Sequence, residues 1–259
     1  MHTRRSVSGL ALALAASGLP LSRALAIPDL AGPPKPLSLE RDVPTIAEAL
    51  ASEVATTGVG TPYQGEVTMG KKVLAGAPAS QPGRPVTPLA VAQYFLDVGA
   101  GRVDPDWAGY VQEWPVRANP VILGFFDETS YRRPAGDTTP WCAAFVNWCM
   151  HRAYTGRAGS DVLAGTRSAA SQSFLNWPGS IRTDDPKPGD LCVFTNTGDP
   201  AHGHVAFLVG RSGNSLFILG GNQRYQSGYN SGEVNISRFN ANSPSQPLTA
   251  FVTAKGLRG

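Results

Sequence analysis

A cysteine and a histidine, each at the start of an apolar segment, are the side chains whose types and spacing suit nucleophilic chemistry. Cys142 lies in the run TPWCAAF over residues 139–145. Threonine is a good N-cap and proline suits the first helical position, so the run predicts a helix over residues 140–154 with Cys142 in its first turn. Unpaired N–H groups and the helix dipole favour a thiolate there. The alternative is a small core residue, the usual role of a lone cysteine.

A thiol nucleophile needs a base, and the chain offers four histidines. His2 belongs to an N-terminal leader, and His151 lies nine positions beyond Cys142 on the same predicted helix, too far along the axis to touch it. His204 enters an apolar strand, whereas His202 lies in the turn before that strand. We therefore favour His204 as the base and keep His202 as the alternative, since a histidine in a turn is also simply a solvated residue.

The base in turn needs an orienting group, which we expect at the end of the neighbouring strand. The strand predicted over residues 215–219 is followed by GGNQ at residues 220–223. Asn222 is placed to accept a hydrogen bond from the imidazole, although asparagine is also a common turn residue, and Gln223 is the alternative partner. The backbone N–H of Cys142, at the helix start, is the candidate oxyanion donor.

Three residues next to the candidate catalytic residues in the sequence are candidates for substrate binding: Trp141, Gly221 and Gln223. Gly221 would let a substrate backbone pass closely because it carries no side chain. Trp141 is suited to line a groove, and it is equally suited to cap the core. The chain has no C-x-x-C pair and few histidines, so we expect no structural zinc site. The sequence implies no other metal and no organic cofactor, and calcium binding stays open.

Four motifs in order resemble the CHAP family, the cysteine- and histidine-dependent amidases and peptidases of bacterial and phage cell-wall enzymes. They are PWCAAFVNW at 140–148, PGD at 188–190, GHV at 203–205 and GGNQ at 220–223. The resemblance implies a papain-like fold and cleavage of amide bonds in peptidoglycan or muropeptides. It also implies that the nucleophile, base and polar partner are Cys142, His204 and Asn222.

One position departs from the family pattern. Many CHAP enzymes carry a glutamate two places before this asparagine, where the present chain has Gly220. A neutral Asn222 orients an imidazole without stabilising imidazolium as a carboxylate would. Two other functions therefore stay open, a catalytically silent wall-binding module and a thiol acyltransferase that uses the same site.

The order of the predicted elements indicates an α+β fold, a papain-like core with N-terminal helices packed on a C-terminal antiparallel β-sheet. A loop is expected over residues 57–85, where glycine, proline and threonine are frequent. Helices are predicted at 45–55, 88–98, from 119 onward, 140–154 and 168–177, with helical character also at 104–114. Strands are predicted at 191–195, 204–209, 215–219, 232–238 and 248–254.

The N-terminus has the pattern of an export signal. Residues 1–26 combine an arginine pair, an apolar stretch and an A-x-A cleavage site, which favours twin-arginine export over an ordinary secretory signal. We expect an N-terminal extension over 27–118, a CHAP-like domain over 119–259, and a protein located in the periplasm or outside the cell. The apolar stretch is too short and too interrupted to span a bilayer permanently, so we expect no stable membrane insertion after signal removal.

The charge of the chain gives no sign of a nucleic-acid partner. The formal net charge is +3, and the leader alone contains three arginines and no acidic residue, so its removal brings the charge to zero. The three cysteines are Cys142, Cys149 and Cys192. In an oxidising compartment we expect Cys142 to be free, and the other two to be buried thiols or to form a bridge.

Overall fold

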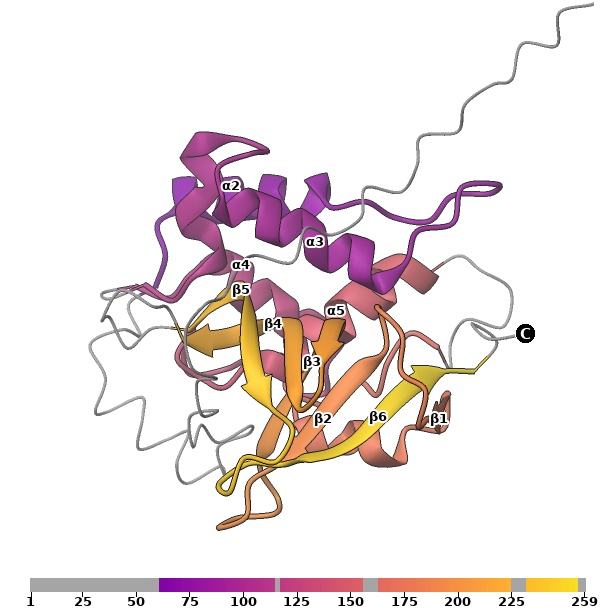
Figure 1. Ribbon diagram of the computed structural model, residues 1–259. Helices are drawn as coiled ribbons and strands as arrows, with labels where there is room; N and C mark the ends of the chain where they lie inside the picture. Colours follow the sequence, from indigo (N-terminus) through magenta and orange to yellow (C-terminus); the bar gives the residue numbers. More distant parts are fainter. Residues whose placement is uncertain (1–60, 115–116, 156–162, 225–231, 256–259) are drawn as a thin grey trace, which may run out of the picture.

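The computed structural model describes residues 61–114, 117–155, 163–224 and 232–255. The predicted leader, the proline-rich segment that follows it and the helix expected at 45–55 lie outside these residues. Among the described residues, helices gather on one side of the molecule and strands on the other (Figure 1). The predicted α+β class is confirmed.

The strands in the described ranges form one antiparallel sheet of six strands in the order β1-β6-β2-β3-β4-β5. All five predicted strands are confirmed, and β1 is an additional short strand at the edge. A two-residue turn joins β3 to β4, and β4 continues through the GGNQ motif, where we had expected the strand to end. The strands are β1 (Ser180–Arg182), β2 (Leu191–Thr195), β3 (Gly203–Ser212), β4 (Ser215–Arg224), β5 (Gly232–Asn240) and β6 (Leu248–Ala254).

Within the described residues, the helical side contains four α-helices and three short 3-10 segments. The helices predicted at 88–98 and from 119 onward are confirmed, with side-chain caps from Thr87 and Asn119. The segment predicted at 168–177 forms only a short 3-10 turn. The helices are α2 (Gln64–Gly76), α3 (Pro88–Gly99), α4 (Pro120–Phe125) and α5 (Cys142–Tyr154), and the 3-10 segments are η2 (Pro105–Val111), η3 (Phe126–Glu128) and η4 (Ser171–Asn176).

The expectation of a loop over 57–85 was wrong, because residues 64–76 form α2. Its glycines look like helix breakers in the sequence, yet Gly70 and Gly76 are positions of close packing. A Cβ at Gly70 would lie 2.8 Å from Cγ of Pro120, so glycine allows α2 and α4 to approach. At the N-terminus of α2, Glu66 accepts a hydrogen bond from the Tyr63 backbone N–H and so caps the helix. Tertiary packing therefore overrides the weak local propensity.

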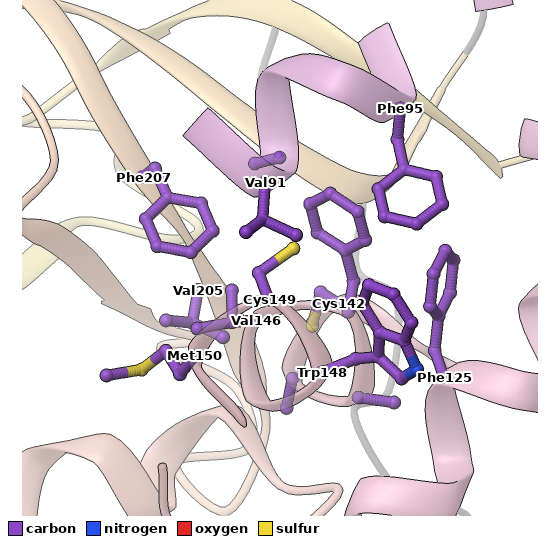
Figure 2. Close-up of a cluster of buried hydrophobic side chains, with 14 of the residues drawn as sticks. Val91, Phe95, Phe125, Cys142, Val146, Trp148, Cys149, Met150, Val205 and Phe207 are labelled. Atoms are coloured by element: carbon purple, nitrogen blue, oxygen red, sulfur yellow. The ribbon is translucent and has the colours of Figure 1, made fainter. Parts of the chain in front are cut away.

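The two faces of the sheet belong to two separate hydrophobic clusters. α5 packs against β3 and β4, and Figure 2 shows Val146 and Cys149 of this helix beside Val205 and Phe207 of β3. The intervening Ala206 faces the opposite side, in a second cluster with Phe194, Ile218 and Phe239. Strand alternation explains this division, because successive side chains point to opposite faces.

The described part of the N-terminal extension shares the first cluster. Val73 of α2, Phe95 of α3 and Val111 of η2 are buried in the same core as α5. Phe95 makes edge-to-face ring contacts with Phe125 and Trp148 at centroid distances of 5.1 and 5.3 Å. Such pairs add to the stabilisation that burial alone provides. The helices before residue 118 thus help to hold α5 in place.

Candidate active site

Cys142 is the first residue of α5, closer to the helix start than the sequence indicated. The helix begins after Pro140 rather than at it, with Trp141 in the N-cap position and without a side-chain cap. Backbone N–H groups in this first turn have no intrahelical acceptors, and they carry the positive end of the helix dipole. Cys142 is 1% exposed. The N–H groups of a helix start stabilise negative charge, whereas burial in apolar surroundings opposes it.

Trp141 anchors the start of α5 to two other parts of the chain. Its side chain is completely buried, and its indole N–H donates to Oε1 of Glu113 over 3.1 Å. On the sheet side its ring lies so close to Gly221 of β4 that a Cβ at this position would collide with the ring. The structure therefore places Trp141 in the core, and the close approach at Gly221 is made by Trp141.

Glu113 is a buried carboxylate that the sequence analysis did not identify. Its backbone N–H donates to the carbonyl oxygen of Gly232 over 2.9 Å, and its side chain is 9% exposed. A Cβ at Gly232 would lie 2.6 Å from Oε1 of Glu113 and 2.5 Å from Oδ1 of Asn222. Oε1 of Glu113 and Oδ1 of Asn222 therefore both lie close to Gly232 of β5. Nothing in the local sequence around Glu113 marks it as a site residue.

His204 is the second residue of β3 and is 6% exposed. It is paired with Phe194 of β2, and its ring lies 6.5 Å from the Phe194 ring and 6.0 Å from the Phe239 ring, centroid to centroid. Burial lowers the pKa of His204 to about 4, and its hydrogen bond to Gln223 acts in the opposite direction. The imidazole is therefore neutral at neutral pH, as a general base must be.

Gln223, the alternative partner in the sequence, contacts the His204 ring. Its Oε1 lies 3.4 Å from Nε2 of His204. A β-bulge explains why this residue reaches the ring: Gly220 pairs with Asn235 but Gln223 pairs with Glu233, so β4 has one extra residue there. The bulge brings Gln223 to the face that simple alternation would have assigned to its predecessor.

Asn222 lies within this bulge and has a positive φ of 57°. Asparagine tolerates this left-handed conformation better than most residues. The side chain is 7% exposed, and its Oδ1 lies over Gly232 of β5. The role of Asn222 as the polar partner of the base stays a prediction.

Asp137 is a second buried acid, in the loop before α5. Its Oδ2 accepts hydrogen bonds from the backbone N–H groups of Trp114 and Asn119, over 2.9 and 2.7 Å. Its Oδ1 is buried and has no hydrogen-bond partner among the described residues. Burial raises the pKa of Asp137 to about 6, and the backbone hydrogen bonds oppose this shift. Asp137 thus fastens the segment before α4 to the loop before α5.

The remaining sequence candidates lie in ordinary structural surroundings. His202 is in the turn before β3, where its Nδ1 lies 2.7 Å from Oδ2 of Asp199. All three cysteines are free and buried. Cys149 and Cys192 belong to clusters on opposite faces of the sheet, so the bridge that we left open does not form. Burial raises the pKa of both thiols well above the usual value.

No group of three or more histidine, cysteine, aspartate or glutamate side chains within the described residues is arranged to hold a metal ion. None of the helices in the described ranges combines the length and the apolar character that crossing a bilayer requires.

Comparison with known proteins assigns the central part of the chain. The family model of the CHAP domain matches residues 134–222, a range that runs from the loop before α5 to Asn222 and includes both Cys142 and His204. Searches of curated proteins and of solved structures gave no match. Over these residues the chain is similar to the CHAP domain, the family that its motifs resemble.

Proposed function

We propose that this protein is an exported cysteine amidohydrolase or peptidase that cleaves amide bonds in peptidoglycan. Cys142 is the nucleophile and His204 the base. The observation that carries the proposal is the position of Cys142 at the first residue of α5, within a CHAP domain. A helix start activates a cysteine, whereas a structural cysteine gains nothing from that position.

Contacts around β4 support a shared site for the two residues. Trp141, immediately before Cys142, packs on Gly221, and Gln223, two residues further along β4, contacts His204. The pairing between β3 and β4 starts at Phe207 and Leu219, so His204 lies before the first paired residue of β3. The GGNQ segment of β4 thus contacts the start of α5 through Gly221 and the His204 ring through Gln223.

The reaction follows from these groups. The Cys142 thiol transfers its proton to the unprotonated ring nitrogen of His204, and the thiolate attacks the amide carbonyl carbon. The Cys142 backbone N–H donates to the resulting oxyanion. His204 then protonates the leaving amine as the C–N bond breaks, which leaves a thioester on Cys142. Water, deprotonated by His204, hydrolyses the thioester, releases the carboxylate product and restores the thiol.

The location and domain organisation belong to the same proposal. Residues 1–26 are a twin-arginine export signal, and the mature protein acts in the periplasm or outside the cell. Residues 27–118 are an N-terminal extension and residues 119–259 the hydrolase domain. Burial of Val73 and Phe95 in the α5 core supports a structural role for the end of the extension. Mass spectrometry of protein exported by its producer would identify the cleavage site.

Digestion of purified sacculi tests the activity. We expect the wild-type protein to release new amino groups but no new reducing ends, because it cuts amide and not glycosidic bonds. Cys142→Ala should abolish this release while the variant unfolds at a similar temperature. Cys149→Ala, on the same helix but seven residues beyond Cys142, should retain activity and is the matched control. A folded Cys142→Ala variant with wild-type amine release would refute the proposal.

The glycine at position 220 supports a second candidate, the catalytically silent wall-binding module. Gly220 lacks the carboxylate that many CHAP enzymes carry there. A silent module would bind sacculi and release no amines from walls of any chemical type. An acyltransferase would instead form a new amide when an amine acceptor is added, so product analysis separates the three functions.

A further inference from the structure

A chain of side-chain hydrogen bonds leads from His204 to a carboxylate on the neighbouring strand. Oε1 of Gln223 lies 3.4 Å from the imidazole, and Nε2 of Gln223 donates to Oδ1 of Asn235 over 2.8 Å. Nδ2 of Asn235 donates to Oε1 of Glu233 over 2.8 Å. Glu233, Asn235 and Gln223 share one face because Glu233 pairs with Gln223 across the strands. We infer that these three residues form a relay that positions His204 for catalysis.

The far end of the relay fixes its direction. An ionised carboxylate only accepts hydrogen bonds, so the amide group of Asn235 that faces Glu233 must be the NH2. Oδ1 of Asn235 therefore faces Gln223, and Ser237 also donates to this oxygen over 2.7 Å. A second observation agrees: Nε2 of Gln223 lies 2.6 Å from the main-chain oxygen of Asn235, which accepts but cannot donate. In both amides the oxygen therefore faces the His204 end of the relay, and the NH2 group faces the Glu233 end.

The near end of the relay fixes the tautomer of the base. Because the NH2 of Gln223 is engaged with Asn235, its oxygen faces Nε2 of His204. An oxygen at this place requires the proton of the neutral imidazole to be on Nε2, so the lone pair is on Nδ1. The relay thus selects the ring nitrogen that accepts the Cys142 proton in the proposed function, on which this inference rests.

The relay also occupies the place of the carboxylate that this chain lacks. A Cβ at Gly220 would lie 3.2 Å from Oε1 of Gln223 and 2.8 Å from Cβ of Ala206. The Gln223 amide thus fills the space into which a glutamate at position 220 would project. The carboxyl group of Glu233, one strand away, is instead connected to the imidazole through two amides. Gln223, Asn235 and Glu233 are positioning residues in this account, and none of them touches the reacting atoms.

Histidine nitrogen NMR on the purified full-length chain tests the relay without relying on activity. The four imidazoles of the 15N-labelled protein give a simple long-range 1H–15N spectrum, and the signal absent from His204→Gln identifies His204. We expect protonated Nε2 and bare Nδ1 at pH 7. Gln223→Met should admit the other tautomer and lower kcat about tenfold or more with KM nearly unchanged, because a wrong tautomer is costly to catalysis.

Variants at Glu233 separate the relay from simple packing. Glu233→Met removes the acceptor from a half-buried position and should lower kcat about three- to tenfold, with a weaker change of tautomer. Glu233→Gln keeps an oxygen in place and should recover part of this loss. Glu128→Gln, at a carboxylate 3.1 Å from Nδ1 of His151, is the matched control and should leave the His204 signals unchanged. If Gln223→Met does not fold, Glu233→Met alone decides.

Two outcomes would overturn the relay: a proton on Nδ1 of His204 in the wild-type protein, or a tautomer and kcat that neither Gln223→Met nor Glu233→Met changes. Failure of the proposed function looks different. In that case the wild-type protein releases no amines from sacculi, yet the His204 tautomer still responds to Gln223→Met.

Discussion

Asp137 and His204 are both buried and ionisable, yet the fold holds them in different ways. Asp137 is held by two backbone N–H groups, and one of its oxygens lacks a partner among the described residues. His204 is held by the Gln223 amide, which is itself fixed by the side chain and the main-chain oxygen of Asn235. Backbone donors fix where a carboxylate lies, whereas a side-chain relay also selects which ring nitrogen carries the proton. The first arrangement fastens two segments together, and in the proposed mechanism the second prepares a base.

The two groups also respond to pH in opposite directions. His204 has a pKa of about 4 in the folded protein and an ordinary value of 6.5, so the unfolded chain binds the proton more tightly. Its contribution to stability is present above pH 6.5 and is lost as pH falls to about 4. Asp137 has a folded pKa of about 6 against 3.8, so its contribution is complete below pH 3.8 and is lost as pH rises through 6. Between pH 4 and 6 the two trends oppose each other.

The largest expected effect separates the proposed catalytic role of His204 from the structural role of Asp137. His204→Gln should lower kcat/KM for amine release by about a thousandfold, in the range that removal of a general base produces. Asp137→Asn preserves an acceptor for both backbone N–H groups and should stay within about threefold of wild type. Initial rates on purified sacculi measure both. Comparable losses in the two variants would remove the distinction between the sites.

The next effect concerns stability. Asp137→Ala leaves the N–H groups of Trp114 and Asn119 without their acceptor, and each buried unpaired group costs about 1–3 kcal/mol. We expect the free energy of unfolding in urea to fall by about 2–4 kcal/mol. Asp137→Asn is the control and should lose less than half as much. An alanine variant as stable as wild type would show that Asp137 fastens nothing.

The pH profile of stability sharpens the comparison. In the wild-type protein the opposing trends of Asp137 and His204 should partly cancel between pH 4 and 6. Asp137→Asn removes the loss of stability that Asp137 causes as pH rises. From pH 4 to 6 the free energy of unfolding of this variant should therefore rise by about 3 kcal/mol more than that of wild type, at about 1.4 kcal/mol per pKa unit. Urea titrations at half-unit steps measure this difference. Parallel profiles for the two proteins would contradict the assigned pKa of Asp137.

A smaller effect is expected where the start of α5 meets β4. Gly221→Ala would place a Cβ against the Trp141 ring and 2.9 Å from Cβ of Phe145, and such overpacking costs about 1–3 kcal/mol. Gly65→Ala is the matched control, because nothing lies within 4 Å of its added Cβ in α2, and alanine there should stabilise by about 0.5–1 kcal/mol. Thermal unfolding of both variants tests the pair. A neutral Gly221→Ala would mean that the Trp141 contact is not tight.

Sequence patterns predicted the elements whose period and boundaries agree. β6 lies where the strand at 248–254 was expected, and α3 begins at the predicted proline after its Thr87 cap. α2 was missed because the reason for its glycines lies in another part of the chain, in the contact of Gly70 with Pro120. Local composition cannot reveal a partner fifty residues away.

The same limit applies within the site. The helix position of Cys142 and the strand position of His204 follow from local patterns, and both were predicted. The contact of Gln223 with His204 depends on a bulge at positions 221–222, which moves the side chains beyond it to the other face. Glu113 and Asp137 are invisible in the sequence for a related reason, since only the tertiary fold buries them beside the segments that they hold.

Alkylation of the thiols tests the central claim, an activated Cys142 paired with His204, most directly. Brief iodoacetamide treatment from pH 5 to 9, followed by mass spectrometry, compares Cys142 with Cys149 and Cys192 in one molecule. We predict selective labelling of Cys142 already near pH 6, and at least a tenfold slower reaction in His204→Gln. Labelling of Cys142 only near the ordinary pKa of a free thiol, about 8.5, would contradict the account. Labelling at the same rate in the wild-type protein and in His204→Gln would contradict it as well.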